Sequence, residues 1–172
     1  MYEFALNNTA KDYKSRGALL NNLTEAASYV NPTKSIEYGK QSLEYNKIIN
    51  SAVECGKSLA AISIAYSKLS LFDEATKASD EALELFDQIG YKAGKIFALF
   101  SKLVCEIIKN DNNSDQCKNI LQEMQNIYNE IEVYQYLIVY ARLLCGLLTE
   151  DTNGIEWLDR EKTFYSVKEL IK

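Results

Sequence analysis

Apolar residues recur along this chain every three or four positions, the spacing that places side chains on one face of a helix. One such stripe runs through Leu59, Ile62, Tyr66 and Leu69, and the next runs through Ala75, Ala78, Ala82, Leu85 and Ile89. A stripe of this kind must be covered, because a helix with one apolar face is stable only when that face packs against another element. The pattern therefore predicts an all-α protein of packed amphipathic helices.

Polar residues and a single proline interrupt the pattern where helices are expected to begin. Asn31 stands before Pro32, a typical N-cap residue followed by proline in the first turn. Ser70 and Asp73 stand three apart before another apolar stripe, and residues 110–113 form a polar loop. These breaks predict eight helices, over residues 10–29, 32–49, 52–69, 73–89, 91–109, 113–130, 132–149 and 153–170.

The chain also repeats itself with a period of roughly 40 residues. Residues 35–44 align with residues 75–84, with small side chains at matching places and a shared Leu-Glu pair. Gly56-Lys57 and Gly94-Lys95 each precede an apolar helical run, and residues 85–89 have a looser counterpart in 127–131. The period predicts a single domain over residues 1–172, with repeats at about 10–50, 51–90, 91–131 and 132–172. The last segment, 153–172, is expected to be a terminal capping helix.

Composition and charge indicate where the protein is located and which ligands it is not expected to bind. One proline and seven glycines among 172 residues suit an all-α fold. The apolar run from Leu143 to Leu148 has six residues, far fewer than the roughly 20 that a membrane helix needs. Met1 to Tyr13 lacks the pattern of a signal peptide, so we expect a cytoplasmic protein. A net charge of −5 argues against direct nucleic-acid binding, which favours a basic surface.

The residues that carry most enzyme chemistry are missing. The chain has no histidine, which is the commonest general base and a frequent metal ligand. Its glycines stand singly, so no phosphate-binding loop is present. Cys55, Cys105, Cys117 and Cys145 lack metal-ligand spacing and are expected to be reduced thiols, mostly buried. We therefore expect no enzymatic activity, no cofactor and no metal ion.

The second repeat carries the clearest motif. It reads Leu59-x-x-Ile62-Ser63-x-x-Tyr66, followed by Phe72, Ala75 and Ala82. The other repeats begin with Leu20-x-x-Leu23-Thr24, Phe97-x-x-Phe100-Ser101 and Leu137-x-x-Tyr140-Ala141. Over roughly residues 15–150 the chain thus resembles the tetratricopeptide repeat family. It lacks the family's early tryptophan and terminal proline. Its units of about 40 residues, rather than 34, are similar to the long-helix variety of bacterial signalling and regulatory proteins.

The resemblance implies a right-handed superhelical α-solenoid of about four helix-turn-helix repeats, which binds a protein or peptide on its concave face. The residues that it places in this groove are Asn21, Glu25, Lys57, Ile64, Lys68, Lys95, Lys102, Gln135 and Arg142. Glu25 and Ile64 stand where family members that grip chaperone C-termini have asparagines, so that particular clamp is not expected. The groove cations, set against an acidic helix at residues 73–89, are consistent with a basic trough for an acidic or extended peptide.

Several alternatives remain open at this point. The groove lysines could instead be ordinary solvated side chains. The chain could be a regulatory or sensor segment of a larger bacterial signalling protein, such as a peptide-responsive regulator or a cyclase- or kinase-linked sensor. Residues 155–172 could pair two copies of the chain. Most of the twelve tyrosines, including Tyr66, Tyr128 and Tyr140, lie on packing stripes and are expected in the core.

Overall fold

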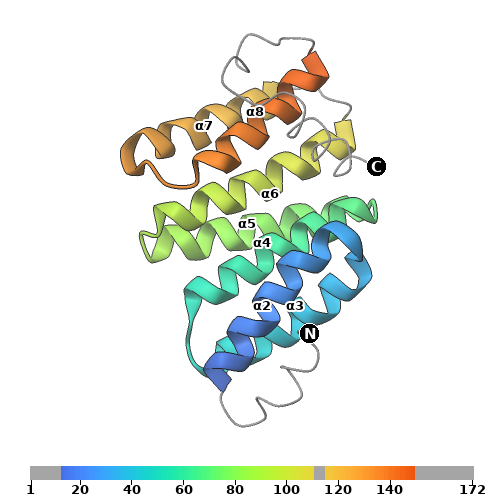
Figure 1. The fold of residues 1–172 in the computed structure, drawn as a ribbon, viewed down its shortest axis with the longest axis vertical. Helices are drawn as coiled ribbons and strands as arrows, with labels where there is room; N and C mark the ends of the chain where they lie inside the picture. Colours follow the sequence, from blue (N-terminus) through green and yellow to red (C-terminus); the bar gives the residue numbers. More distant parts are fainter. Residues whose placement is uncertain (1–12, 111–114, 150–172) are drawn as a thin grey trace.

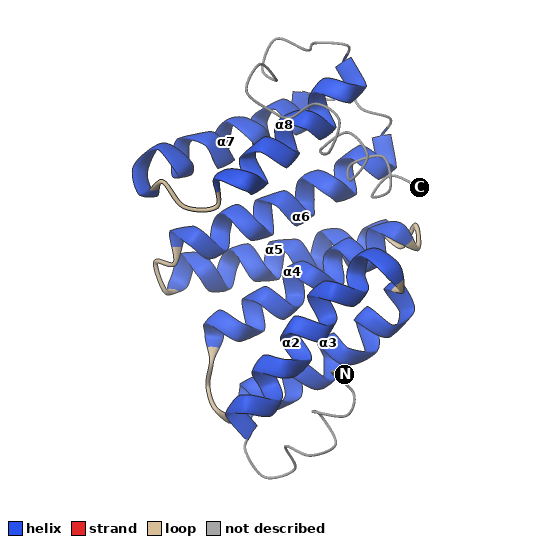
Figure 2. Ribbon diagram, viewed as in Figure 1, coloured by secondary structure: helices blue, strands red, loops and turns tan. Residues whose placement is uncertain are grey.

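The computed structural model describes residues 13–110 and 115–149, and every element in these two ranges is a helix. The helices are α2 (Tyr13–Val30), α3 (Pro32–Ile48), α4 (Ala52–Lys68), α5 (Phe72–Gln88), α6 (Lys92–Asn110), α7 (Asp115–Ile131) and α8 (Gln135–Thr149). The all-α prediction is confirmed for this part of the chain (Figure 2). The eighth predicted helix, 153–170, lies outside the described residues.

The helices form two layers, and the hairpins follow one another in chain order along the long axis of the molecule (Figure 1). In one layer, α2 packs on α4, α4 on α6, and α6 on α8. We call α2, α4, α6 and α8 the even layer. The other helices, α3, α5 and α7, each pack against the two even helices that flank them in sequence, and we call them the odd layer. This arrangement is that of a helical repeat.

The turns between helices recur every 20 residues from α3 to α6. A residue with positive φ follows α3, α4 and α5 in turn: Asn50 at 53°, Ser70 at 59° and Gly90 at 66°. The next amide then reaches back to the last helical turn, with Ser51 N to Asn46 O, Leu71 N to Tyr66 O and Tyr91 N to Phe86 O all at 2.9 Å. This is the Schellman motif, which satisfies carbonyls that the helix end leaves free. One turn geometry therefore spaces four helices evenly.

The turn between α2 and α3 is shorter and differently made. Asn31 alone separates the two helices, and its side chain accepts a hydrogen bond of 3.1 Å from the amide of Lys34. Pro32 occupies the first turn of α3, where its missing N–H has no helical partner to lose. The N-cap that the sequence predicts at Asn31 is confirmed.

Burial along α3 and α5 is nearly the same when the two helices are compared at a shift of 40 residues. The buried residues of α3 are Ser35, Tyr38, Gly39, Ser42 and Asn46, and those of α5 are Ala75, Ala78, Ser79, Ala82 and Phe86. The 40-residue period therefore holds for the pattern of buried positions as well as for the sequence. The first unit places several polar side chains where the second has apolar ones.

Phe86 shows why glycine recurs in the even layer. Its side chain is fully buried and lies against Gly56 of α4 and Gly94 of α6. A Cβ atom on either glycine would come within 2.6 Å of the Phe86 ring. The ring also meets Tyr91 edge-on at 5.6 Å between centroids. Phe86 of α5 thus packs against α4, α6 and the turn between α5 and α6.

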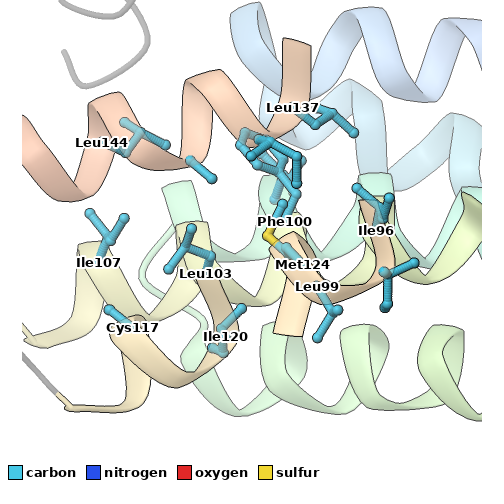
Figure 3. Close-up of a cluster of buried hydrophobic side chains, with 14 residues drawn as sticks. Ile96, Leu99, Phe100, Leu103, Ile107, Cys117, Ile120, Met124, Leu137 and Leu144 are labelled. Atoms are coloured by element: carbon cyan, nitrogen blue, oxygen red, sulfur yellow. The ribbon is translucent and has the colours of Figure 1, made fainter. Parts of the chain in front are cut away.

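The largest apolar cluster fills the space among α6, α7 and α8 (Figure 3). It includes Leu103 and Met124, which are fully buried, and it reaches back to Ile64 of α4. The side chains in Figure 3 come from both layers and converge between them. The C-terminal half of the described chain is therefore held mainly by apolar packing.

The left-handed residues give a direct test of the turns. Replacing Ser70 by glycine removes the steric cost of a side chain at positive φ, and we expect unfolding free energy to rise by about 0.5–1 kcal/mol. The matched change Gly90→Ser should lower it by a similar amount. Urea unfolding followed by circular dichroism measures both. A loss of stability in Ser70→Gly would contradict the turn geometry.

Candidate ligand-binding surface

Five tyrosines from distant parts of the sequence gather beside the even layer. They are Tyr29 of α2, Tyr91 of the turn before α6, Tyr134 just before α8, and Tyr136 and Tyr140 of α8. The rings of Tyr134 and Tyr136 meet edge-on at 5.8 Å between centroids, and Tyr91 lies close enough to Tyr134 to raise its pKa. Tyr29 lies close enough to Tyr136 and Tyr140 to interact with them electrostatically. We call this group the tyrosine surface.

The tyrosine surface is only partly covered. Tyr29, Tyr134 and Tyr140 are half-buried and pack on the apolar cluster of Figure 3, whereas Tyr136 is 54% exposed. Phenol rings offer apolar contact area together with a hydroxyl that can donate or accept a hydrogen bond. Surfaces with this mixture suit contact with another polypeptide.

The phenols of Tyr29, Tyr134 and Tyr136 have raised pKa values. Burial, followed by the nearby carboxylate of Glu25, raises the pKa of Tyr29 to about 12. Burial is also the largest cause that raises the pKa of Tyr136, again with Glu25 second. For Tyr134, burial and then the neighbouring Tyr91 raise the pKa. The hydroxyls of these three tyrosines therefore keep their protons near neutral pH and remain hydrogen-bond donors.

Three charged residues stand among the tyrosines: Glu25, Lys57 and Lys68. Glu25 lies one helical turn before Tyr29 on the same face of α2, and it is exposed. Lys57 forms an ion pair of 2.9 Å with Glu54. Each of the three is a residue that the sequence places in the groove. The structure thus brings part of the predicted set together.

Lys68 connects two helices of the even layer. Its ammonium donates a hydrogen bond of 2.9 Å to the carbonyl of Tyr29, in the last turn of α2, and lies 5.6 Å from the centroid of the Tyr29 ring. A cation at a helix C-terminus is favoured by the helix dipole. Burial lowers the pKa of Lys68 from its ordinary value. This lysine therefore has a structural role in joining α2 to α4.

The cations predicted farther along the groove also have partners. Lys95 pairs with Asp87 at 2.6 Å, and Lys102 pairs with Asp80 at 2.6 Å. Arg142 donates a hydrogen bond of 2.6 Å to the side chain of Gln125. The acidic helix predicted at 73–89 thus supplies carboxylates to the lysines of α6. These pairs leave less free positive charge than the sequence alone indicates.

Two predicted groove residues are buried. Ile64 is 1% exposed and belongs to the apolar cluster that α6, α7 and α8 share. Asn21 is 6% exposed, and its amide nitrogen donates to the Glu54 carboxylate at 2.6 Å. Neither side chain offers a surface to a ligand in this conformation. The last of the predicted set, Gln135, begins α8, but its side chain lies outside the described residues.

Asn21 belongs to a buried polar network that joins α2, α3 and α4. The hydroxyl of Ser58 lies 2.9 Å from both Asn21 Oδ1 and Ser42 Oγ, and Ser42 in turn donates to the carbonyl of Gly17 at 3.1 Å. Asn46 Nδ2 donates to Ser42 Oγ at 2.9 Å. Ser42 and Asn46 of this network lie in the first repeat at the positions that Ala82 and Phe86 hold in the second. Among the described residues, Asn46 Oδ1 is the one oxygen of this network that accepts no hydrogen bond. The remaining bonds tie α2, α3 and α4 to one another.

The cysteines show no sign of redox chemistry. Cys145 is half-buried, and burial, with a smaller contribution from Cys117, raises its pKa to about 11. Cys105 is buried and lies 3.9 Å from the hydroxyl of Thr76. Cys105 and Cys145 hold equivalent places in the repeat, but their closest polar neighbours differ. A raised pKa keeps the thiol of Cys145 protonated and unreactive.

A second concave region is mostly acidic and lies on α5 and α6. It is lined by Asp73, Thr76, Lys77, Asp80, Glu81, Glu84 and Lys109. No cluster of acidic or cysteine side chains in the described ranges could hold a metal ion. None of the helices α2 to α8 is both long and apolar enough to cross a membrane. No protein-family model matches this chain, and no curated protein is significantly similar to it. The tyrosine surface, which joins residues of three repeats, is the candidate site that the structure offers in the described chain.

Sequence reasoning did not find the tyrosine surface as a unit. It placed Tyr140 in the core, and the structure does pack this residue on the apolar cluster. However, Tyr29, Tyr91 and Tyr136 come from three different repeats, and no local pattern links them. The one available signal was the high tyrosine count of twelve in 172 residues.

The pKa of Tyr29 gives a pH-dependent test. Because the folded pKa exceeds that of the unfolded chain, the unfolded state loses its proton first, and stability falls as pH rises above 10. We expect Tyr29→Phe to remove this loss, so that the variant gains about 1 kcal/mol relative to the parent between pH 9 and pH 11. Urea unfolding at both pH values measures the difference. Tyr45→Phe, outside this surface, controls for loss of a phenol, and an unchanged difference for Tyr29→Phe would contradict the assignment.

Proposed function

We propose that this chain is a tetratricopeptide-like scaffold that binds an extended segment of another protein on the tyrosine surface. In this proposal the even layer is the concave side of an α-solenoid, and the odd layer is its outer side. The observation that carries the proposal is the gathering of five tyrosines from α2, the turn before α6, and the region of α8. The chain acts by binding and catalyses no reaction.

The layer arrangement supports the proposal. The even helices contact one another in series, so residues of successive repeats form one continuous surface. Tyrosine is enriched at protein interfaces because its rigid ring gives a large contact area for little loss of side-chain entropy. The exposed ring of Tyr136 and the neutral hydroxyls beside it offer such contacts.

The charge distribution favours an extended ligand over a strongly acidic one. Lys57, Lys95 and Lys102 each form an ion pair within the chain. An acidic ligand would have to compete with Glu54, Asp87 and Asp80 for these lysines. Hydrogen bonds from phenols to the backbone of a peptide require no such exchange. We therefore assign the main affinity to the tyrosines.

A display selection tests this function. Random twelve-residue peptides are selected on the immobilised chain, and the enriched peptides are synthesised and titrated by fluorescence anisotropy. We expect Tyr136→Ala to weaken binding by about tenfold or more, because an aromatic anchor at an interface is often worth over 1 kcal/mol. The change should leave the fold intact, since Tyr136 is largely exposed.

Glu37→Gln serves as the control, because Glu37 is exposed on α3 in the odd layer. It should bind the same peptides with the affinity of the parent chain. The proposal fails if no peptide is enriched, or if the two variants bind equally well.

A further inference from the structure

Both oxygens of the Glu54 carboxylate are bound to groups of the even layer. Oε2 accepts a hydrogen bond of 2.6 Å from Asn21 Nδ2, on α2, and Oε1 pairs with Lys57 Nζ, one helical turn along α4, at 2.9 Å. Asn21 is 6% exposed, whereas the side chains of Glu54 and Lys57 are 27% and 36% exposed. Two donors from two helices therefore converge on one carboxylate that solvent reaches.

Helix capping does not account for this placement of Glu54. It stands three residues after the N-cap Ser51, where a glutamate often bonds to the amide of the N-cap residue. The amide of Ser51 instead donates to the carbonyl of Asn46 at 2.9 Å. The helix dipole favours an acid anywhere in the first turn, so it does not select these two partners. The carboxylate is directed to Asn21 and Lys57 by the site itself.

The next repeat forms without such a contact. Gly56-Lys57 aligns with Gly94-Lys95, and this alignment places Lys92 where Glu54 stands. Lys95 pairs instead with Asp87 of the odd layer, whose side chain is 58% exposed. The helical repeat therefore does not require an acid that bridges two even helices, and the contact of Glu54 is specific to α2 and α4.

The two donors of this contact suit any carboxylate. An ammonium and an amide N–H both donate to an ionised carboxylate, and such charge-assisted hydrogen bonds are the stronger ones. Glu54 reaches the donors through the single bonds of its own side chain, so a change of rotamer frees both. The buried amide of Asn21 would then need another acceptor, because a buried donor without a partner is costly.

We propose that Asn21 and Lys57 form a binding site for the carboxylate of an acidic side chain, and that Glu54 occupies this site when no ligand is bound. As a tethered group, Glu54 competes at a high effective concentration, so a free carboxylate does not displace it. A ligand enters only when its other contacts hold its carboxylate beside the site. Glu54 thus excludes carboxylates that arrive alone.

Opening the site in the full chain tests this inference. In Glu54→Ala the two donors lose their carboxylate, and acetate should bind in its place. At several times its dissociation constant, sodium acetate should raise the thermal unfolding midpoint of this variant by about 2–4 °C above the midpoint in sodium chloride of equal ionic strength. The parent chain should show no such difference, because Glu54 fills its site. The side-chain amide NMR signal of Asn21 should shift with acetate in the variant alone.

Asp80→Ala is the matched control, because it removes the carboxylate that pairs with Lys102 and leaves the contact of Glu54 intact. Acetate should not change its midpoint, and adding Lys57→Met to Glu54→Ala should abolish the response. Glu54→Ser opens the same site if the alanine variant does not fold. The inference is wrong if acetate and chloride act alike on the opened variant, or if the parent or the double variant responds as strongly. None of these measurements uses a selected peptide, so such a result would leave the proposed function standing.

Discussion

The structure depends on one connection, the three-residue turn closed by a left-handed residue. Asn50, Ser70 and Gly90 place this turn every 20 residues, so α3, α4 and α5 each have 17 residues and reverse direction at equal intervals. Equal helices with equal turns must stack in register, and alternate helices then fall into the same layer. The even layer and its continuous surface follow from this constraint.

The first two repeats fill equivalent buried positions with different side chains. In the first unit, Ser42 and Asn46 join three helices through hydrogen bonds, while in the second Ala82 and Phe86 occupy the equivalent places. Phe86 needs Gly56 and Gly94 beside it, because a Cβ at either position would strike its ring. The same helix arrangement therefore accepts either polar or apolar buried side chains, provided that the neighbouring residues suit them.

Helix positions were predictable because their causes are local. Apolar spacing and the Asn31-Pro32 cap placed all seven described helices within three residues of their observed bounds. Exposure in the candidate site was harder to predict, because it depends on contacts across repeats. Ile64 is buried by packing with α6, α7 and α8, and Lys95 and Lys102 find partners on α5. Tyr29 and Tyr140 pack on the same apolar cluster, and no sequence period encodes this proximity.

The central claim is that α2 and α8, far apart in sequence, form one binding surface. Hydrogen–deuterium exchange, measured with and without a selected peptide, tests this claim most directly. Our account predicts that the peptide slows amide exchange around Tyr29 in α2 and around Tyr136 in α8 together, and leaves α5 unchanged. Protection confined to one of these two helices, or centred on α5, would contradict it.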